Sequence, residues 1–125
     1  MKDGKFVILY VDDDQDFLDA VRMILEPNGY LMVEALTAEQ GLKVYKEHQP
    51  DFIIVDLMME EVDAGTSFVK ELKALGNTAP VYMLSSVGNS LNISTDYSSL
   101  GLSGVFQKPI DPQTLLTVLK TKLKK

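Results

Sequence analysis

Apolar residues follow two different spacings along the chain, and the two alternate from one end to the other. Short runs of consecutive apolar residues are typical of strands in a sheet that is covered on both faces. Apolar residues that return at every third or fourth position are typical of helices that pack one face against a core. The pattern predicts five strands, at residues 6–11, 30–36, 52–56, 81–84 and 105–107.

Polar residues at the ends of the periodic segments predict where helices begin or end. Asp14 is placed to cap the helix after the first strand, and Thr37, followed three residues later by glutamine, opens a capping box. Gly76 is placed to stop a third helix, and Asp111 to cap the last one. Residues 85–104, SSVGNSLNISTDYSSLGLSG, are rich in residue types that are poor in helix interiors, so we expect a short or irregular fourth helix there.

Strands that alternate with helices predict an α/β fold, in which a parallel sheet carries helices on both faces. We expect the doubly wound strand order 2-1-3-4-5, in which ligands bind beyond the carboxyl ends of the strands. With 125 residues the chain is long enough to bury a core, and we expect a single domain over residues 1–125.

Composition and charge narrow the classes of protein to which this chain can belong. Apolar residues make up 46% of the chain and charged residues 24%, as in ordinary soluble globular proteins. A net charge of −6 argues against direct binding to nucleic acid or to an anionic membrane surface, because both need a basic surface. The chain has no cysteine and no apolar run near the roughly 18 residues of a membrane span, which fits a cytoplasmic protein.

Chemically active side chains stand at the ends of four predicted strands. Asp12 and Asp13 follow the first strand, Asp56 ends the third, Ser85 follows the fourth and Lys108 follows the fifth. Taken singly, acids are common at helix starts, and hydroxyls and lysines are common in loops. Together they place three carboxylates opposite a hydroxyl and an ammonium group, and carboxylate oxygens suit a hard cation such as Mg²⁺ or Mn²⁺. A shared cation also explains the adjacent acids, since two carboxylates about 4 Å apart otherwise repel by roughly 4 kcal/mol.

These residues and their spacing resemble the receiver domain of bacterial two-component response regulators, over essentially the whole chain. The resemblance rests on the acidic pair in VDDD, on PDFIIVD, on Asp63 seven residues after Asp56, on PVYMLSS, and on KP after the last strand. It implies a flavodoxin-like fold and a role in phosphoryl signalling similar to that of chemotaxis response regulators.

The resemblance implies a role for each candidate residue. Asp56 matches the aspartate that accepts a phosphoryl group from a histidine kinase or a phosphotransfer protein, Ser85 the switch hydroxyl, and Lys108 the lysine that pairs with the phosphoryl group. The implied ligands of Mg²⁺ (or Mn²⁺) are Asp12, Asp13, Asp56 and the backbone carbonyl of Met58. Such a domain catalyses only its own phosphorylation and dephosphorylation, and it signals to a downstream protein through the surface of its fourth helix, fifth strand and last helix.

The chain also departs from the family pattern. Glu60 and Ala64 stand where the family usually has proline and glycine, and Val105 stands where it has an aromatic switch residue. Phe106 lies one residue after this position, and by strand alternation its side chain is expected on the face opposite to that of Val105. We therefore hypothesise that Asp56 is phosphorylated but that the signal does not travel by the usual serine–aromatic coupling.

Three other functions fit parts of the sequence. Asp12 and Asp14 form the Asp-x-Asp pattern of a haloacid-dehalogenase-like phosphohydrolase, but the chain lacks room for the cap of such enzymes. An FMN-binding flavodoxin shares the topology, yet three acids in the first loop would repel the FMN phosphate. A degenerate receiver that acts only as a phosphorylation-independent docking module keeps the fold and drops the chemistry.

Overall fold

Strands and helices alternate along the chain in the computed structural model, which describes residues 4–56, 64–85, 103–107 and 110–123. The described strands are β1 (Val7–Val11), β2 (Leu31–Ala35), β3 (Phe52–Asp56), β4 (Val81–Ser85) and β5 (Gly104–Gln107). The described helices are α1 (Gln15–Leu25), the short 3₁₀ helix η1 (Glu26–Asn28), α2 (Ala38–His48), α3 (Ala64–Ala74) and α5 (Pro112–Lys122). None of them has the length and apolar character that a membrane span requires.

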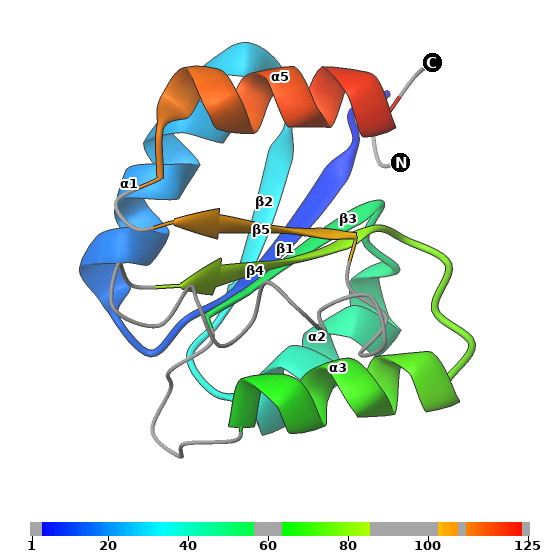
Figure 1. Ribbon diagram of the computed structural model, residues 1–125. Coiled ribbons are helices and arrows are strands. Elements are labelled where there is room, and N and C mark those ends of the chain that lie inside the picture. The colour runs from blue at the N-terminus through cyan, green and yellow to red at the C-terminus, as the bar shows by residue number, and fades with distance from the viewer. Residues whose placement is uncertain (1–3, 57–63, 86–102, 108–109, 124–125) are drawn as a thin grey trace.

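The described strands form one parallel sheet in the order β2-β1-β3-β4-β5, which is the predicted order (Figure 1). β1 lies between β2 and β3, and its last residue, Val11, is opposite Ala35 on one side and Val55 on the other. The carboxyl ends of β1 and β3 therefore lie side by side, and the acids that follow these two strands reach the same edge of the sheet.

Helices cover both faces of the sheet, α1 and α5 on one face and α2 and α3 on the other (Figure 1). Alternate residues of β1 enter two separate cores, because successive side chains of a strand point to opposite faces. Leu9 and Val11 pack in the core under α2 and α3, and Ile8 and Tyr10 pack in the core under α1 and α5. This two-sided burial explains the continuous apolar run at this strand.

The predicted helix caps are present. The Asp14 carboxylate caps α1 by accepting a hydrogen bond from the backbone N–H two residues on, and Asp111 caps α5 by accepting one from the N–H three residues on. Thr37 Oγ1 accepts from the Gln40 N–H at 3.0 Å. The Gln40 side chain accepts in return from the Leu36 N–H at 2.6 Å, one residue before the cap that a regular capping box would reach.

Several element boundaries differ from the prediction by one or two residues, and the predicted fourth helix falls largely on residues 86–102, outside the described residues. α3 begins at Ala64, two residues earlier than expected. β5 begins at Gly104, which the sequence pattern placed in the preceding loop. A Cβ at Gly104 would lie 2.5 Å from Cε2 of Tyr82, so the glycine lets the strand pass directly beneath that ring.

Candidate functional site

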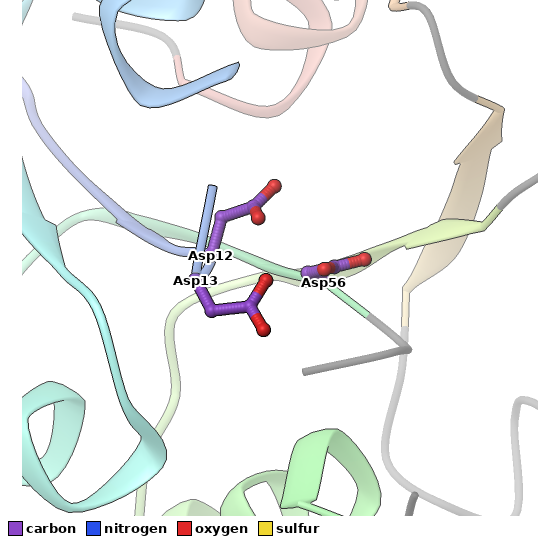
Figure 2. A group of neighbouring side chains, drawn as sticks. All are labelled: Asp12, Asp13 and Asp56. Atoms are coloured by element: carbon purple, nitrogen blue, oxygen red, sulfur yellow. The ribbon is translucent and has the colours of Figure 1, made fainter. Parts of the chain in front are cut away.

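Three carboxylates meet at the edge of the sheet where β1 and β3 end (Figure 2). Asp12 and Asp13 directly follow β1, and Asp56 is the last residue of β3. Each carboxylate offers one oxygen atom, and these three oxygen atoms all lie within 4.8 Å of one another. The sequence predicted this meeting, and the parallel pairing of β1 with β3 produces it.

The three carboxylates differ in their exposure to solvent. Asp12 is 0% exposed and Asp56 is 3% exposed, and they are the two buried charged residues among the described residues. Asp13 is exposed. Burial of a carboxylate is unfavourable unless hydrogen bonds or opposite charge compensate for the lost water. The cluster therefore has a buried side at Asp12 and Asp56 and a side at Asp13 that a ligand from solution can reach.

The buried Asp12 is held by hydrogen bonds from both sides. The Tyr10 hydroxyl donates to Asp12 Oδ2 at 2.5 Å, and the Asp14 N–H donates to Asp12 Oδ1 at 2.9 Å. The backbone N–H of Asp12 donates to the Ala35 carbonyl at 3.0 Å, which ties this residue to β2. Asp14 lies outside the cluster, and its own carboxylate caps α1, as predicted.

Tyr10 is the residue at this site that the sequence analysis missed, because it stands inside an apolar run. Burial, the hydrogen bond to Asp12 and the negative charge of Asp12 raise the pKa of the Tyr10 hydroxyl far above its ordinary value of 10.0. The hydroxyl therefore stays protonated and remains a donor. A tyrosine two residues before a strand-end aspartate is the signal that could have revealed it, since both side chains leave the strand on the same face.

The other predicted site residues are described only in part. Ser85 ends β4, the strand next to β3, and Leu84 just before it pairs with Asp56, so the Ser85 backbone reaches the same edge as the cluster. The side chain of Ser85 lies outside the described part of the chain, as do Met58 and Lys108.

The donor set suits a hard divalent cation. Among the described residues the candidate ligand atoms at this edge are carboxylate oxygens, which Mg²⁺ and Mn²⁺ prefer. One oxygen from each residue lies within 4.8 Å of the others, so the three residues are grouped as candidate ligands of one ion. Without positive charge nearby, three carboxylates this close would repel one another.

The sequence and the fold agree with known proteins of one family. The family described as response regulator receiver domain matches residues 8–120. Chemotaxis protein CheY of Bacillus subtilis is 32% identical over 117 residues, which cover 93% of this chain and 96% of that protein. The DNA-binding transcriptional regulator RpaA of Synechocystis sp. is also 32% identical, over 94% of this chain but 49% of RpaA, so this chain spans about half the length of that relative.

Solved structures agree with the sequence match. The chemotaxis response regulator CheY4 of Vibrio cholerae superimposes with a TM-score of 0.84 at 28% sequence identity, over 96% of this chain and 100% of that one. The family match and the superposition both extend over nearly all of the chain. The chain therefore belongs to the response regulator receiver domain family of two-component systems and is a regulatory domain.

Proposed function

We propose that this domain accepts a phosphoryl group on Asp56 from a histidine kinase or a phosphotransfer protein, while Asp12, Asp13 and Asp56 hold Mg²⁺ or Mn²⁺. One observation carries the proposal: oxygens of these three carboxylates lie within 4.8 Å of one another at the joint end of β1 and β3. Membership of the receiver family supports it, because phospho-acceptance at an acidic cluster is typical of that family.

The reaction is a transfer between two nucleophiles. An oxygen of the Asp56 carboxylate forms a bond to phosphorus while the bond from phosphorus to the donor histidine nitrogen breaks, which leaves an aspartyl phosphate and a histidine. A cation bound at the cluster supplies positive charge against the oxygens of the transferred group. We assign a corresponding role in charge neutralisation to Lys108, the switch hydroxyl to Ser85, and a further metal ligand to the Met58 carbonyl.

The position of Asp56 in the fold suits a phospho-acceptor. β3 is a central strand, paired on one side with β1 and on the other with β4, so the backbone of Asp56 is held firmly. Rigid placement of a reacting atom contributes much of the rate enhancement in transfers of this kind. The side chain is nearly buried, which limits competing attack by water at the product.

The phosphorylated state would differ from the resting state mainly in charge. A phosphoryl group carries close to two negative charges and strong acceptor oxygens. We propose that residues 1–125 act as one receiver domain, and that this charge biases the surface of the fourth helix, β5 and α5 toward a downstream protein. In this proposal the domain performs only its own phosphorylation and dephosphorylation.

The test is labelling with a small phosphodonor such as acetyl phosphate in the presence and absence of Mg²⁺. We expect wild type to gain one phosphoryl group in the presence of Mg²⁺, located on Asp56 by peptide mass spectrometry, and Asp56→Asn to gain none. Asp19→Asn is the matched control, because it removes the same charge from an exposed position on α1. Labelling of Asp56→Asn to the same extent as wild type would refute the assignment.

The same experiment separates the competing functions. A folded wild type that binds Mg²⁺ but is never labelled would indicate a docking module. A phosphoryl group trapped on Asp12 would indicate a phosphohydrolase. The structure disfavours the hydrolase, because the carboxylate of Asp14, its required general acid, is engaged as the cap of α1 through the Asp16 N–H at 2.9 Å.

A further inference from the structure

The Tyr10 side chain connects the acidic cluster to the core on one face of the sheet. Tyr10 and Asp12 are two residues apart in an extended segment, so their side chains leave the backbone on the same face. The ring of Tyr10 is completely buried in the core that α1 and α5 cover, together with Leu18 and Leu115. Its hydroxyl reaches out of this core to Asp12 Oδ2 at 2.5 Å.

The ring cannot easily move, and therefore its hydroxyl is a fixed donor. Tyr10 lies in β1, which pairs with β2 and β3 on its two sides, and Tyr10 itself stands opposite Glu34 and Ile54. Close-packed interiors resist the displacement of a large ring. The second hydrogen bond to Asp12 comes from the N-cap residue of α1: the Asp14 N–H donates to Oδ1 at 2.9 Å. Two donors on different oxygens restrict rotation of the carboxylate about both of its side-chain torsions.

A buried tyrosine hydroxyl needs some acceptor, so a hydrogen bond alone does not imply a functional role. What distinguishes Tyr10 is the identity of the acceptor. Asp12 is one of the three residues whose oxygens lie within 4.8 Å of one another (Figure 2), and it is the completely buried one. The exposed Asp13 can adjust to a ligand by rotation, whereas the orientation of Asp12 is set by its donors.

We infer that Tyr10 is a positioning residue for the divalent cation: its hydroxyl fixes the orientation in which the Asp12 carboxylate meets the metal. The inference rests on the proposed metal site and adds to it a partner outside the ligand set. Hydrogen-bond partners of metal ligands typically contribute about 10- to 100-fold to metal affinity. Mg²⁺ demands near-ideal octahedral geometry, whereas Ca²⁺ tolerates irregular geometry. If Tyr10 is a positioning residue, removal of its hydroxyl should therefore weaken the binding of Mg²⁺ more than the binding of Ca²⁺.

The test is the Tyr10→Phe variant, which removes one oxygen atom and keeps the ring. Dissociation constants for Mg²⁺ and for Ca²⁺ are measured by titration calorimetry in wild type, in Tyr10→Phe and in the control Tyr45→Phe. Tyr45 lies on α2, is half-buried, and packs against the core on the other face. We expect Tyr10→Phe to weaken Mg²⁺ binding about tenfold or more and Ca²⁺ binding clearly less, and Tyr45→Phe to change neither.

The possible outcomes separate this inference from the proposed function. If wild type binds no Mg²⁺, the proposed metal site is wrong and the inference falls with it. If wild type binds Mg²⁺ and Tyr10→Phe binds it equally well or more tightly, only the inference is wrong. Equal weakening of Mg²⁺ and Ca²⁺ binding also overturns it, because a general disturbance of the site would have that effect.

A second measurement needs no variant and decides the matter should Tyr10→Phe fail to fold. The ¹³C resonance of the Tyr10 Cζ atom, next to the hydroxyl, responds to a change at the hydrogen-bond acceptor. In wild type we expect this resonance to shift during a Mg²⁺ titration. The midpoint of the shift should agree with the dissociation constant for Mg²⁺ that calorimetry gives. A Tyr10 resonance that stays in place while Mg²⁺ saturates the site would overturn the inference.

Discussion

Phe106 of β5 stacks on Tyr82 of β4, with ring centroids 4.8 Å apart and ring planes inclined by 26°. Phe52 of β3 stacks on Tyr82 as well, at 5.1 Å, so three aromatic rings span three neighbouring strands in the core that α1 and α5 cover. Phe106 is 5% exposed and belongs to this core. Strand alternation predicted that Phe106 would point to the face opposite to Val105. Phe106 packs in the core that α1 and α5 cover, and the side chain of Val105 lies outside the described part of the chain.

Substitution of Phe106 tests its role as a core residue. We expect Phe106→Ala to lower the free energy of unfolding by about 3–5 kcal/mol, because it removes a buried ring and leaves a cavity beside Tyr82. The measurement is equilibrium urea unfolding. Met23→Ala is the control, since Met23 is 77% exposed on α1 and its truncation should cost about 0.5 kcal/mol or less. Similar losses in the two variants would mean that Phe106 is not packed as described.

Gly41 allows α2 to approach the sheet closely, and this reverses the usual effect of replacing a helical glycine. A Cβ at Gly41 would lie 2.9 Å from Val11 Cγ2 and 3.0 Å from Phe68 Cε1. Alanine is normally favoured over glycine inside a helix by about 1 kcal/mol. We nevertheless expect Gly41→Ala to lower the free energy of unfolding by about 1–3 kcal/mol, because it overpacks a filled core.

Thermal and urea unfolding of Gly41→Ala provide the measurement, and Ala20→Gly provides the matched control. Ala20 is exposed on α1, so its replacement should show the ordinary helix preference without any change in packing. An increase in stability on Gly41→Ala would mean that α2 can move away from β1 at little cost. Val11 directly precedes Asp12, so Gly41→Ala is also expected to weaken Mg²⁺ binding.

Much of the fold follows from local sequence patterns and from one rule of parallel sheets. The continuous apolar run of β1 predicted a strand buried on both faces, and Leu9 and Tyr10 do enter different cores. The meeting of Asp12 with Asp56 followed from strand order alone, because parallel strands end at the same edge.

The features that the sequence did not reveal depend on contacts between distant segments. From the sequence alone Gly104 is assigned to a loop. The reason for a glycine there is the ring of Tyr82 on a neighbouring strand, which lies where a Cβ of residue 104 would be. The link from Tyr10 to Asp12 depends on which face of β1 each residue occupies and on the depth at which the aspartate is buried. The roles of all the predicted site residues stay predictions, and Met58, Lys108 and the side chain of Ser85 also lie outside the described part of the chain.

Arg22 joins α1 to the edge strand β2, and this contact predicts part of the pH dependence of stability. The guanidinium forms an ion pair with Glu34 and donates to the Met32 carbonyl at 3.1 Å. The hydrogen bond from Arg22 holds the pKa of the Glu34 carboxyl below its ordinary value of 4.5. Because the pKa is lower in the folded state, the contact stabilises the fold above pH 4.5, and the contribution is lost as the pH falls through the folded pKa.

The variant that tests this contact is Glu34→Gln. We expect it to lower the free energy of unfolding by about 0.5–1 kcal/mol at neutral pH, and by progressively less as the pH falls below 4.5. Urea unfolding over a series of pH values provides the measurement. Glu71→Gln, at an exposed position on α3, is the control for removal of a negative charge. A loss of stability on Glu34→Gln that stays constant down to acidic pH would show that the charge of Glu34 is not responsible.

Removal of one charge from the acidic cluster is expected to change the free energy of unfolding, and the sign of this change should depend on whether Mg²⁺ is present. In the presence of EDTA, we expect Asp13→Asn to raise the free energy of unfolding by about 1 kcal/mol, because it removes one of three mutually repelling charges. With Mg²⁺ present at about a hundred times its dissociation constant, binding should stabilise wild type by about 2.7 kcal/mol. Asp13→Asn lacks one of the three proposed ligands, so Mg²⁺ should stabilise it much less, and the order of stability of the two proteins should reverse.

Thermal unfolding of both proteins across a Mg²⁺ titration measures this reversal. Asp19→Asn again serves as the control, because its exposed carboxylate lies on α1 and it should shift with Mg²⁺ as wild type does. If Asp13→Asn differs from wild type by the same amount with and without Mg²⁺, then Asp13 does not bind the metal. The proximity of its carboxylate to Asp12 and Asp56 would then reflect only the shared end of β1 and β3, and the proposed metal site would have to be rebuilt on the two buried carboxylates.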